Sequence, residues 1–217
     1  MYMAVFYVVF GLLFQRGGGG DFIPFLLCGL TAWKWFASCV DAGSNAIKSN
    51  GSLMGQVHIP KIIFPGTVIL QNTFKFFFVF CILLIFMQFY RPGIDIVYLI
   101  LPLVLIVQFL FICAIAFLLG AIVPFLPDLV YLIRNALQAL FFLSGIFYSV
   151  ADFPGPYQKY FYINPMVTVI DSYRSILIRS EAPNFVSLIW IGSISAITII
   201  VAFHIVKRFD RVYPKII

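Results

Sequence analysis

Charged side chains are scarce in this sequence. Asp, Glu, Lys and Arg make up 10% of the 217 residues, while 63% are hydrophobic; an average soluble domain has about a quarter charged residues. So few charges cannot cover the surface of a water-soluble domain, whereas long apolar runs are what crossing a bilayer requires. The sequence therefore predicts a single all-α polytopic membrane domain over residues 1–217.

Reactive side chains are equally rare. The chain has two His, His58 and His204, in separate segments, a single Glu, and four Cys without metal-ligand spacing. It contains no G-x-S-x-G, no H-E-x-x-H and no G-x-x-x-x-G-K-[ST] nucleotide-binding loop. These absences exclude ATP hydrolysis by the chain alone and argue against a membrane enzyme. We expect no catalytic residue, no metal and no cofactor in this chain.

Six apolar runs predict six membrane spans. A hydrocarbon core about 30 Å thick needs roughly 20 apolar residues in a helix, and polar breaks rich in Gly and Pro separate the runs. The predicted spans cover residues 1–14, 22–46, 67–90, 96–123, 129–150 and 186–206. The first run is short for a span, so either this helix is short or further residues precede it.

The distribution of charge predicts which ends of the spans lie inside. Six crossings place both termini on one side of the membrane. With the termini inside, the inner segments hold seven Lys and Arg against three Asp, whereas the outer segments hold five basic and five acidic residues. This bias follows the positive-inside rule, so we expect both termini in the cytoplasm. It also accounts for most of the net charge of +6, which needs no nucleic-acid partner.

The segment 153–178 looks like a span but is too short and too polar to be one. Asn164 followed by Pro165 has the form of a helix start, with a capping side chain and Pro at the first helical position. The helix that follows would be about 21 Å long. It carries Asp171 and Arg174, three residues apart, whose opposite charges can partly neutralise each other. We predict a short re-entrant helical hairpin on the outer face, between helices five and six, that lines a cavity or caps a pathway.

Two lysines lie deep inside predicted spans. Lys34 lies in the second span between Trp33 and Trp35, and Lys75 lies in the third span beside three Phe. A cation at this depth is costly in lipid and usually faces a polar pathway. Snorkelling of the side chain toward the membrane surface is the competing interpretation. Both lysines are therefore candidates for lining a conduit.

Three short motifs occur in an order and spacing that resemble one protein family. The second span carries G-L-x-x-W, the first inner segment carries L-x-x-x-V-x-[FI]-P-[KR], and the outer hairpin carries S-G-x-x-[FY] … N-P … [YF]-R. The matching residues are Gly29, Leu30 and Trp33; Leu53, Val57, Ile59, Pro60 and Lys61; and Ser144, Gly145, Tyr148, Asn164, Pro165, Tyr173 and Arg174. The chain thus resembles the permease subunits of type-2 ABC exporters for lipid-linked polysaccharides such as O antigen, capsule or teichoic acid. Those permeases usually begin with an amphipathic interface helix, whereas this sequence starts in the first span.

The resemblance implies an assembly and a set of functional residues. It implies a permease homodimer in the bacterial inner membrane, surrounded by membrane lipid and bound to two copies of a separate subunit that holds ATP and Mg²⁺. The substrate would be a polyprenyl-diphosphate-linked glycan, which aromatic faces can bind. The inner segment 50–64 would dock into the ATP-binding subunit through Asn50, Leu53, Met54, Val57 and His58. The channel would be lined by Trp33, Lys34, Trp35, Phe74, Lys75, Phe77, Phe78, Phe141 and Tyr148, with the lysines attracting the diphosphate. The outer gate would consist of Tyr157, Tyr160, Tyr162, Asn164, Pro165, Asp171 and Arg174.

Three other functions stay open at this point. A type-2 ABC permease for a small molecule or drug would share the fold without a continuous aromatic conduit. An ion-coupled carrier would transport without an ATP-binding subunit, but the sequence shows no broken-helix repeat typical of such carriers. A membrane glycan transferase would need an acid and base cluster that the sequence lacks.

Overall fold

The structure, a computed structural model, describes residues 22–51, 60–90, 93, 95–210 and 212–213. Within these residues every regular element is a helix, which confirms the predicted all-α class for this part of the chain. Four helical segments are long and apolar enough to cross a membrane: α2 (Phe22–Ser49), α4 (Ile63–Tyr90), the 3₁₀ turn η2 (Ile96–Ile100) continued by α5 (Leu101–Ile122), and α9 (Phe185–Phe209). Their lengths correspond to about 38–42 Å of helix, more than the thickness of a hydrocarbon core.

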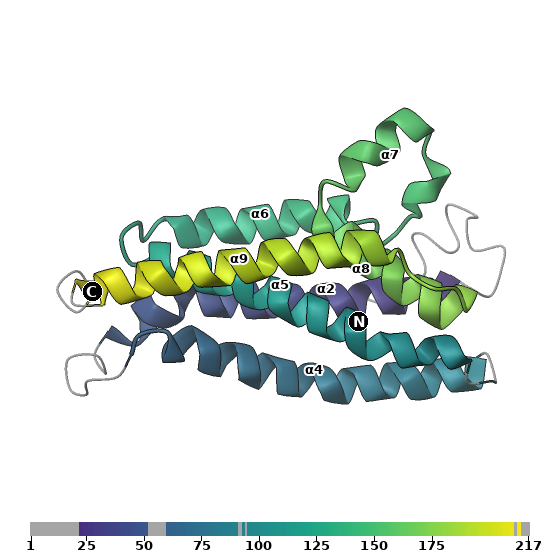
Figure 1. The fold of residues 1–217 in the computed structure, drawn as a ribbon, viewed down its shortest axis with the longest axis horizontal. Coiled ribbons are helices and arrows are strands. Elements are labelled where there is room, and N and C mark those ends of the chain that lie inside the picture. The colour runs from purple at the N-terminus through teal and green to yellow at the C-terminus, as the bar shows by residue number, and fades with distance from the viewer. Residues whose placement is uncertain (1–21, 52–59, 91–92, 94, 211, 214–217) are drawn as a thin grey trace.

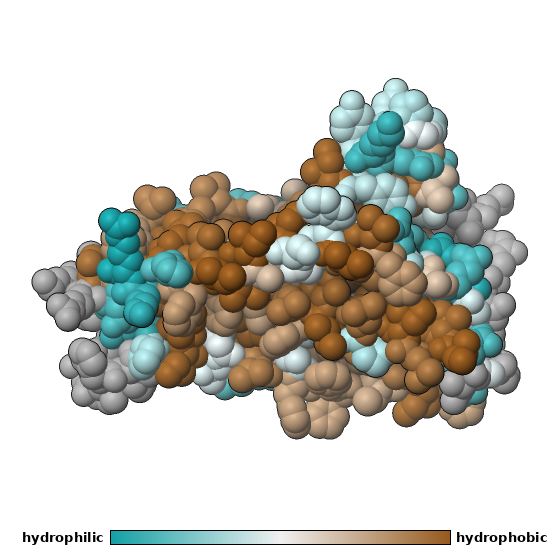
Figure 2. Space-filling model, in the orientation of Figure 1, coloured by the Kyte–Doolittle hydropathy of each residue, from teal (hydrophilic) through white to brown (hydrophobic). Residues whose placement is uncertain are grey.

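The long helices lie roughly side by side along the longest axis of the molecule (Figure 1). α2 packs against α4 and α5, and α5 packs against α9, so α2 and α5 form the centre of the bundle. We call the end that carries α7 (Gly155–Phe161) and α8 (Pro165–Arg174) the hairpin end, and the opposite end, where α9 finishes, the tail end. Figure 2 shows hydrophobic side chains over the middle of the visible face and hydrophilic ones gathered at the two ends. A helix bundle inside a bilayer requires this distribution.

Several predicted span boundaries differ from the helices by one to four residues. α4 begins at Ile63 rather than residue 67, because Pro65 lies in its first turn, where a backbone N–H has no partner within the helix. α9 begins at Phe185, and Oδ1 of Asn184 accepts a hydrogen bond from the N–H of Ser187 at 3.2 Å. The N-cap residue sets the start of this helix.

The helix in the fifth predicted span is shorter than expected. α6 (Leu129–Leu143) ends before Ser144 and Gly145 instead of continuing to Val150. Gly145 has a φ of +66°, a left-handed conformation that Gly adopts readily and that commonly ends a helix. The 15 residues of α6 correspond to about 22 Å. The first predicted span, residues 1–14, lies outside the described residues.

The predicted outer hairpin consists of two unlike halves. α7 has no buried residue and protrudes from the bundle (Figure 1). α8, in contrast, buries eight of its ten residues and packs against α2 and α5. A π-helical turn, Ser175–Arg179, continues α8 and ends at Ser180, whose φ is 57°. The second half of the hairpin is therefore part of the core, and only the first half is exposed.

Small residues allow α2 and α5 to approach closely toward the tail end. A Cβ added at Gly43 would lie 2.9 Å from the Cβ of Ala116, and one added at Gly120 would lie 2.9 Å from the carbonyl oxygen of Gly43. Ala116 and Gly120 are one helical turn apart and share a face of α5. Small residues in this pattern are typical of tightly packed membrane helices.

Replacing Gly120 by Ala should destabilise the bundle by about 1–3 kcal/mol, the usual cost of overpacking. The added methyl group would meet the backbone of α2, which cannot turn away as a side chain can. The measurement is the Tm of the purified protein in detergent. Gly66→Ala is the control, because the nearest atom to its Cβ is 4.0 Å away and Ala is a better helix former than Gly. Equal Tm values for the two variants would contradict the close approach.

Candidate functional site

Arg174, the last residue of α8, is buried in the bundle with 4% of its surface exposed. Its Nη1 donates a hydrogen bond to the carbonyl oxygen of Gly145 (2.7 Å), and its Nη2 donates to those of Ile146 (2.8 Å) and Phe25 (3.2 Å). Nε also donates to the Phe25 carbonyl, at 3.3 Å. The guanidinium carbon lies 3.3 Å from the centroid of the Phe25 ring, a cation–π contact. We call Arg174, with the carbonyl groups of Phe25, Gly145 and Ile146, the Arg174 anchor.

The Arg174 anchor joins three segments that are far apart in the sequence. Phe25 belongs to the first turn of α2, Gly145 and Ile146 follow α6, and Arg174 ends α8. Arg suits this position because its planar guanidinium offers five donors in fixed directions. Gly29 on α2 leaves the necessary space, because a Cβ there would lie 2.9 Å from Nη2 of Arg174. The anchor therefore fixes the hairpin relative to the start of α2 and the end of α6.

The predicted pairing of Asp171 with Arg174 was wrong. Asp171 accepts a hydrogen bond from Nη2 of Arg179 at 2.9 Å and forms an ion pair with it. Glu181 lies 3.7 Å from Nε of the same arginine. The spacing of Asp171 and Arg174 would allow the predicted pair, but the carbonyl groups of the anchor hold the Arg174 guanidinium inside the bundle. Asp171 and Glu181 instead form an exposed cluster with Arg179.

Asn164 fixes the start of α8, which confirms the helix start predicted from the Asn–Pro pair. Its Oδ1 accepts a hydrogen bond from the N–H of Met166 at 3.1 Å, and Pro165 occupies the first helical position. Its Nδ2 donates to Oγ of Ser144 at 2.8 Å, and that hydroxyl donates to the carbonyl oxygen of Leu140. One amide side chain thus caps α8 and links it to the end of α6.

Tyr173 provides a second buried link between the hairpin and the bundle. Its hydroxyl donates to Oε1 of Gln108 on α5 at 2.7 Å, and Nε2 of Gln108 donates to the carbonyl oxygen of Ala32 on α2 at 2.8 Å. Sequence reasoning missed Gln108, although a lone amide in a long apolar run is a recognisable signal for a specific partner. It also missed Phe25, because a residue that accepts hydrogen bonds through its backbone leaves no signal in the sequence.

The aromatic residues of the hairpin lie on α7 or next to it. The predicted gate tyrosines are exposed on or beside this helix: Tyr157, Tyr160 and Tyr162. Tyr148 lies at its base, where the hydroxyl donates to the carbonyl oxygen of Phe142 at 3.0 Å. The Tyr148 ring meets Phe153 and Phe161 edge-on, with centroids 5.3 and 5.8 Å away. Edge-to-face contacts of this kind hold α7 in place.

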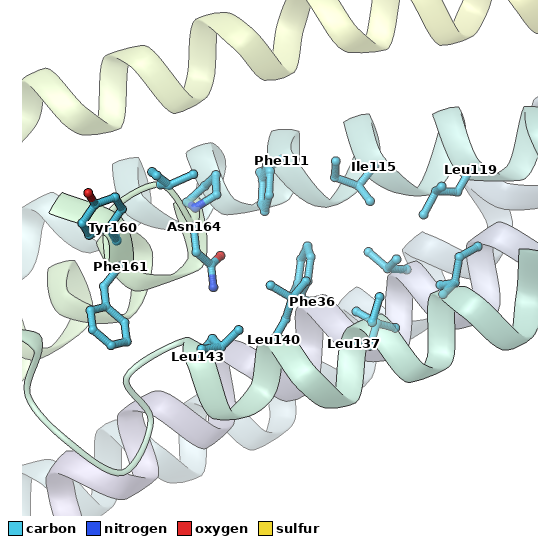
Figure 3. Close-up of a pocket in the computed structure, with 15 residues that line it drawn as sticks. Phe36, Phe111, Ile115, Leu119, Leu137, Leu140, Leu143, Tyr160, Phe161 and Asn164 are labelled. Carbon is cyan, nitrogen blue, oxygen red and sulfur yellow. The ribbon is translucent and has the colours of Figure 1, made fainter. Parts of the chain in front are cut away.

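A pocket of about 610 Å³ lies between α5 and α6 beside the hairpin (Figure 3). Apolar side chains of both helices and Phe36 of α2 form its walls. Tyr160, Phe161 and Asn164 lie at its hairpin end. The pocket exists because α6 packs mainly on α2 and buries only two of its residues.

The predicted channel aromatics fall into two groups. Trp33 and Trp35 are buried: Trp33 lies 6.0 Å from the ring of Phe141, and Trp35 stacks on Phe76 at 4.0 Å. Nε1 of Trp35 donates to Oγ1 of Thr73 at 3.1 Å, as buried indoles usually require. The other group is exposed on α4: Phe74, Phe77 and Phe78. The predicted aromatics therefore differ in exposure, and their assignment to a channel stays a prediction.

Lys34 and Lys75 are brought together by the packing of α2 on α4. Both line one groove of about 410 Å³, together with Ser38, Asn72 and Trp35. Each lysine is exposed and lies near the middle of its helix. Among the described residues neither lysine forms an ion pair. Two cations in one groove at this depth can attract an anionic ligand.

One of the five residues predicted to dock an ATP-binding subunit is described. Asn50 follows α2 at the tail end, where its Nδ2 donates to the carbonyl oxygen of Ala46 at 2.7 Å. The other four lie outside the described residues: Leu53, Met54, Val57 and His58.

Long apolar helices with few, specifically paired polar groups define a multi-pass membrane protein. The described residues contain no group of His, Cys, Asp or Glu that could hold a metal ion. Residues 1–178 match the family described as ABC-2 type transporter, and the chain belongs to that family. Members are transmembrane subunits of ABC transporters, so the family implies an ATP-binding partner.

Two relatives are similar to most of this chain. The O-antigen export system permease protein RfbA of Myxococcus xanthus is 25% identical over 199 residues, which cover 91% of this chain and 76% of that protein. A protein of the same name from Klebsiella pneumoniae is 22% identical over 217 residues, which cover 98% of this chain and 83% of that protein.

Proposed function

We propose that this chain is the permease subunit of an ATP-driven exporter that moves a lipid-linked, O-antigen-like polysaccharide across the bacterial inner membrane. The observation that carries the proposal is the meeting of the motif residues at one place. Gly29 comes from the motif in the second span, whereas Ser144, Gly145, Asn164 and Arg174 come from distant parts of the outer-hairpin motif. Contacts within and beside the Arg174 anchor connect these residues. The names of the two relatives support the same substrate class.

In the proposed assembly, two copies of the chain bind two copies of the ATP-binding subunit. That subunit holds ATP and Mg²⁺, and this chain contributes no cofactor. Each copy crosses the membrane six times, with residues 1–14 as the first span. Lys48 lies in the last turn of α2, and Lys207 and Arg208 lie in the last turn of α9. The positive-inside rule therefore places the tail end in the cytoplasm, and six crossings would place both termini there. Segment 50–64 would then meet the ATP-binding subunit.

The hairpin would act as the outer gate, entering the membrane from outside and returning. α8 would be its fixed half, held by the Arg174 anchor and by the Tyr173–Gln108 hydrogen bond. α7 would be its exposed half, where the exposed side chains of Tyr157 and Tyr160 would contact the emerging glycan. Aromatic faces suit this task, because they bind the C–H faces of sugars without requiring a single hydrogen-bond pattern.

The groove that contains Lys34 and Lys75 would accept the diphosphate of the lipid carrier. Replacing both lysines by Gln should lower export about ten-fold or more, because an interaction worth about 1.4 kcal/mol changes a rate or an affinity ten-fold. Subunit association and ATP hydrolysis should stay near the wild-type values. The measurement is glycan export in vesicles, with Lys207→Gln, an exposed lysine in the last turn of α9, as the control. Full export by the double variant would show that these lysines do not contribute to the export pathway.

A measurement of ATP hydrolysis tests the proposal that the partner subunit, and not this chain, hydrolyses ATP. The purified chain alone should hydrolyse no ATP, and the cognate ATP-binding subunit should form a stable complex with it. A chain that hydrolyses ATP alone, or never binds such a subunit, would contradict the proposal.

A permease for a small molecule or drug is the second candidate. The apolar pocket of about 610 Å³ favours it, because this volume is within the usual range for sites that bind such molecules. Export of an apolar dye by the complex, with no movement of lipid-linked glycan, would support this candidate instead.

A further inference from the structure

Tyr213, in the turn that follows α9, packs against several other elements at the tail end. Tyr213 is fully buried, and its hydroxyl donates to the carbonyl oxygen of Ala121 near the end of α5, at 3.1 Å. Its ring lies 5.4 Å from Phe125, in the connection between α5 and α6, and Phe125 meets Phe209 edge-on at 5.2 Å. Ile47, near the end of α2, belongs to the same buried cluster. The turn therefore contacts α2 and the connection that leads into α6.

Lys61, which precedes α4, is tied to this same turn. It is 2% exposed, and its Nζ lies 3.8 Å from Oδ1 of Asp210. A buried ammonium group is costly unless it is paired, so the position of Asp210 constrains the position of Lys61. Burial, with a further contribution from Asp210, raises the pKa of Tyr213 to about 12. A Tyr hydroxyl is already protonated at physiological pH, and this rise in pKa extends to higher pH the range over which Tyr213 can donate.

We infer that Asp210 and Tyr213 are positioning residues for energy coupling. They hold the segment before α4 in a fixed position relative to the connection between α5 and α6. The inference rests on the proposed function, in which segment 50–64 receives the ATP-binding subunit. A displacement of that segment would reach Lys61, pass to the turn through Asp210, and reach α6 through Tyr213. α6 is suited to respond, because it buries only two residues and its other end leads to the Arg174 anchor.

The test uses the full chain reconstituted with the ATP-binding subunit. Tyr213→Phe removes the hydrogen bond to Ala121 and keeps the ring, and Asp210→Asn removes the charge that pairs with Lys61. Subunit association, ATP hydrolysis and glycan exported per ATP are measured for each variant. Association and hydrolysis should stay near wild type, while glycan exported per ATP falls about five-fold or more, the lower end of typical coupling between distant sites.

Arg208→Gln is the matched control, because Arg208 is an exposed cation in the last turn of α9, and its export per ATP should equal that of the wild type. If Asp210→Asn fails to fold, the double variant Lys61→Met, Asp210→Asn is used instead, because it removes the buried charge together with its partner. Tyr213→Phe tests the inference independently of this ion pair. Export per ATP equal to wild type in the folded variants would overturn the inference and leave the proposed function intact. Loss of folding in Tyr213→Phe would show a purely structural role and would also overturn it. A wild-type chain that binds no ATP-binding subunit would overturn both.

Discussion

Replacing Arg174 by Met is expected to abolish most export and to lower the free energy of unfolding by at least about 3 kcal/mol. The substitution keeps an apolar stem but removes the guanidinium that donates to the carbonyl groups of Phe25, Gly145 and Ile146. Hydrogen bonds to a charged group are worth about 1.5–3 kcal/mol each, and a buried acceptor left unpaired costs a similar amount. The measurements are the Tm in detergent and glycan export in vesicles.

Two further variants distinguish the loss of the anchor's hydrogen bonds from the loss of a positive charge. Arg174→Lys keeps the charge, but a single ammonium group cannot reach the three carbonyl groups from one plane, so its Tm and export should lie between those of wild type and Arg174→Met. Arg179→Gln removes the partner of Asp171, an exposed pair worth about 1 kcal/mol or less. Its export should therefore stay close to wild type. Equal losses of Tm and export in Arg174→Met and Arg179→Gln would contradict the proposed role of the Arg174 anchor.

Replacing Gly29 by Val is expected to have the second largest effect, a loss of about 1–3 kcal/mol in stability with a strong loss of export. A Cβ at this position would lie 2.9 Å from Nη2 of Arg174 and 3.4 Å from Cα of Ile146. The guanidinium is the end of a flexible side chain, but moving it breaks the hydrogen bonds of the anchor. The Ile146 backbone cannot move without displacing the segment after α6.

Gly192→Val on α9 is the control for Gly29→Val, because the nearest atom to a Cβ there is 3.9 Å away. Both variants place the same β-branched residue in a helix, so they share the loss of helix propensity. The double variant Gly29→Val, Arg174→Met should be little worse than Arg174→Met alone, since both substitutions remove the same interaction. Additive losses would show that Gly29 acts independently of the anchor.

The helices and the start of α8 could be predicted because their signals are local. Long apolar runs predict α2, α4, α5 and α9, and Asn164 with Pro165 predicts a capped helix start. The end of α6 was missed because the residues after Gly145 are as apolar as a span, although they leave the helix there. Hydropathy measures preference for lipid and does not detect such a turn. The Ser144–Gly145 pair was the available signal.

The contacts of the site could be predicted only in part. The motifs selected Gly29, Gly145 and Arg174, but their meeting depends on how α2, α6 and α8 pack. Asp171 was assigned to Arg174 because spacing along one helix was the only geometry that the sequence supplied, whereas the true acceptors are backbone carbonyl groups from two other segments. The shared groove of Lys34 and Lys75 likewise follows from the packing of α2 on α4.

The most direct test of the proposed export function is the movement of lipid-linked glycan in proteoliposomes. Vesicles would contain the chain alone or the chain with its cognate ATP-binding subunit, with the glycan supplied on the side from which ATP is accessible. The account predicts that glycan appears on the far side only with both subunits and ATP, and that Arg174→Met prevents this. Transport by the chain alone under an ion gradient, or a complex that hydrolyses ATP without moving glycan, would contradict it.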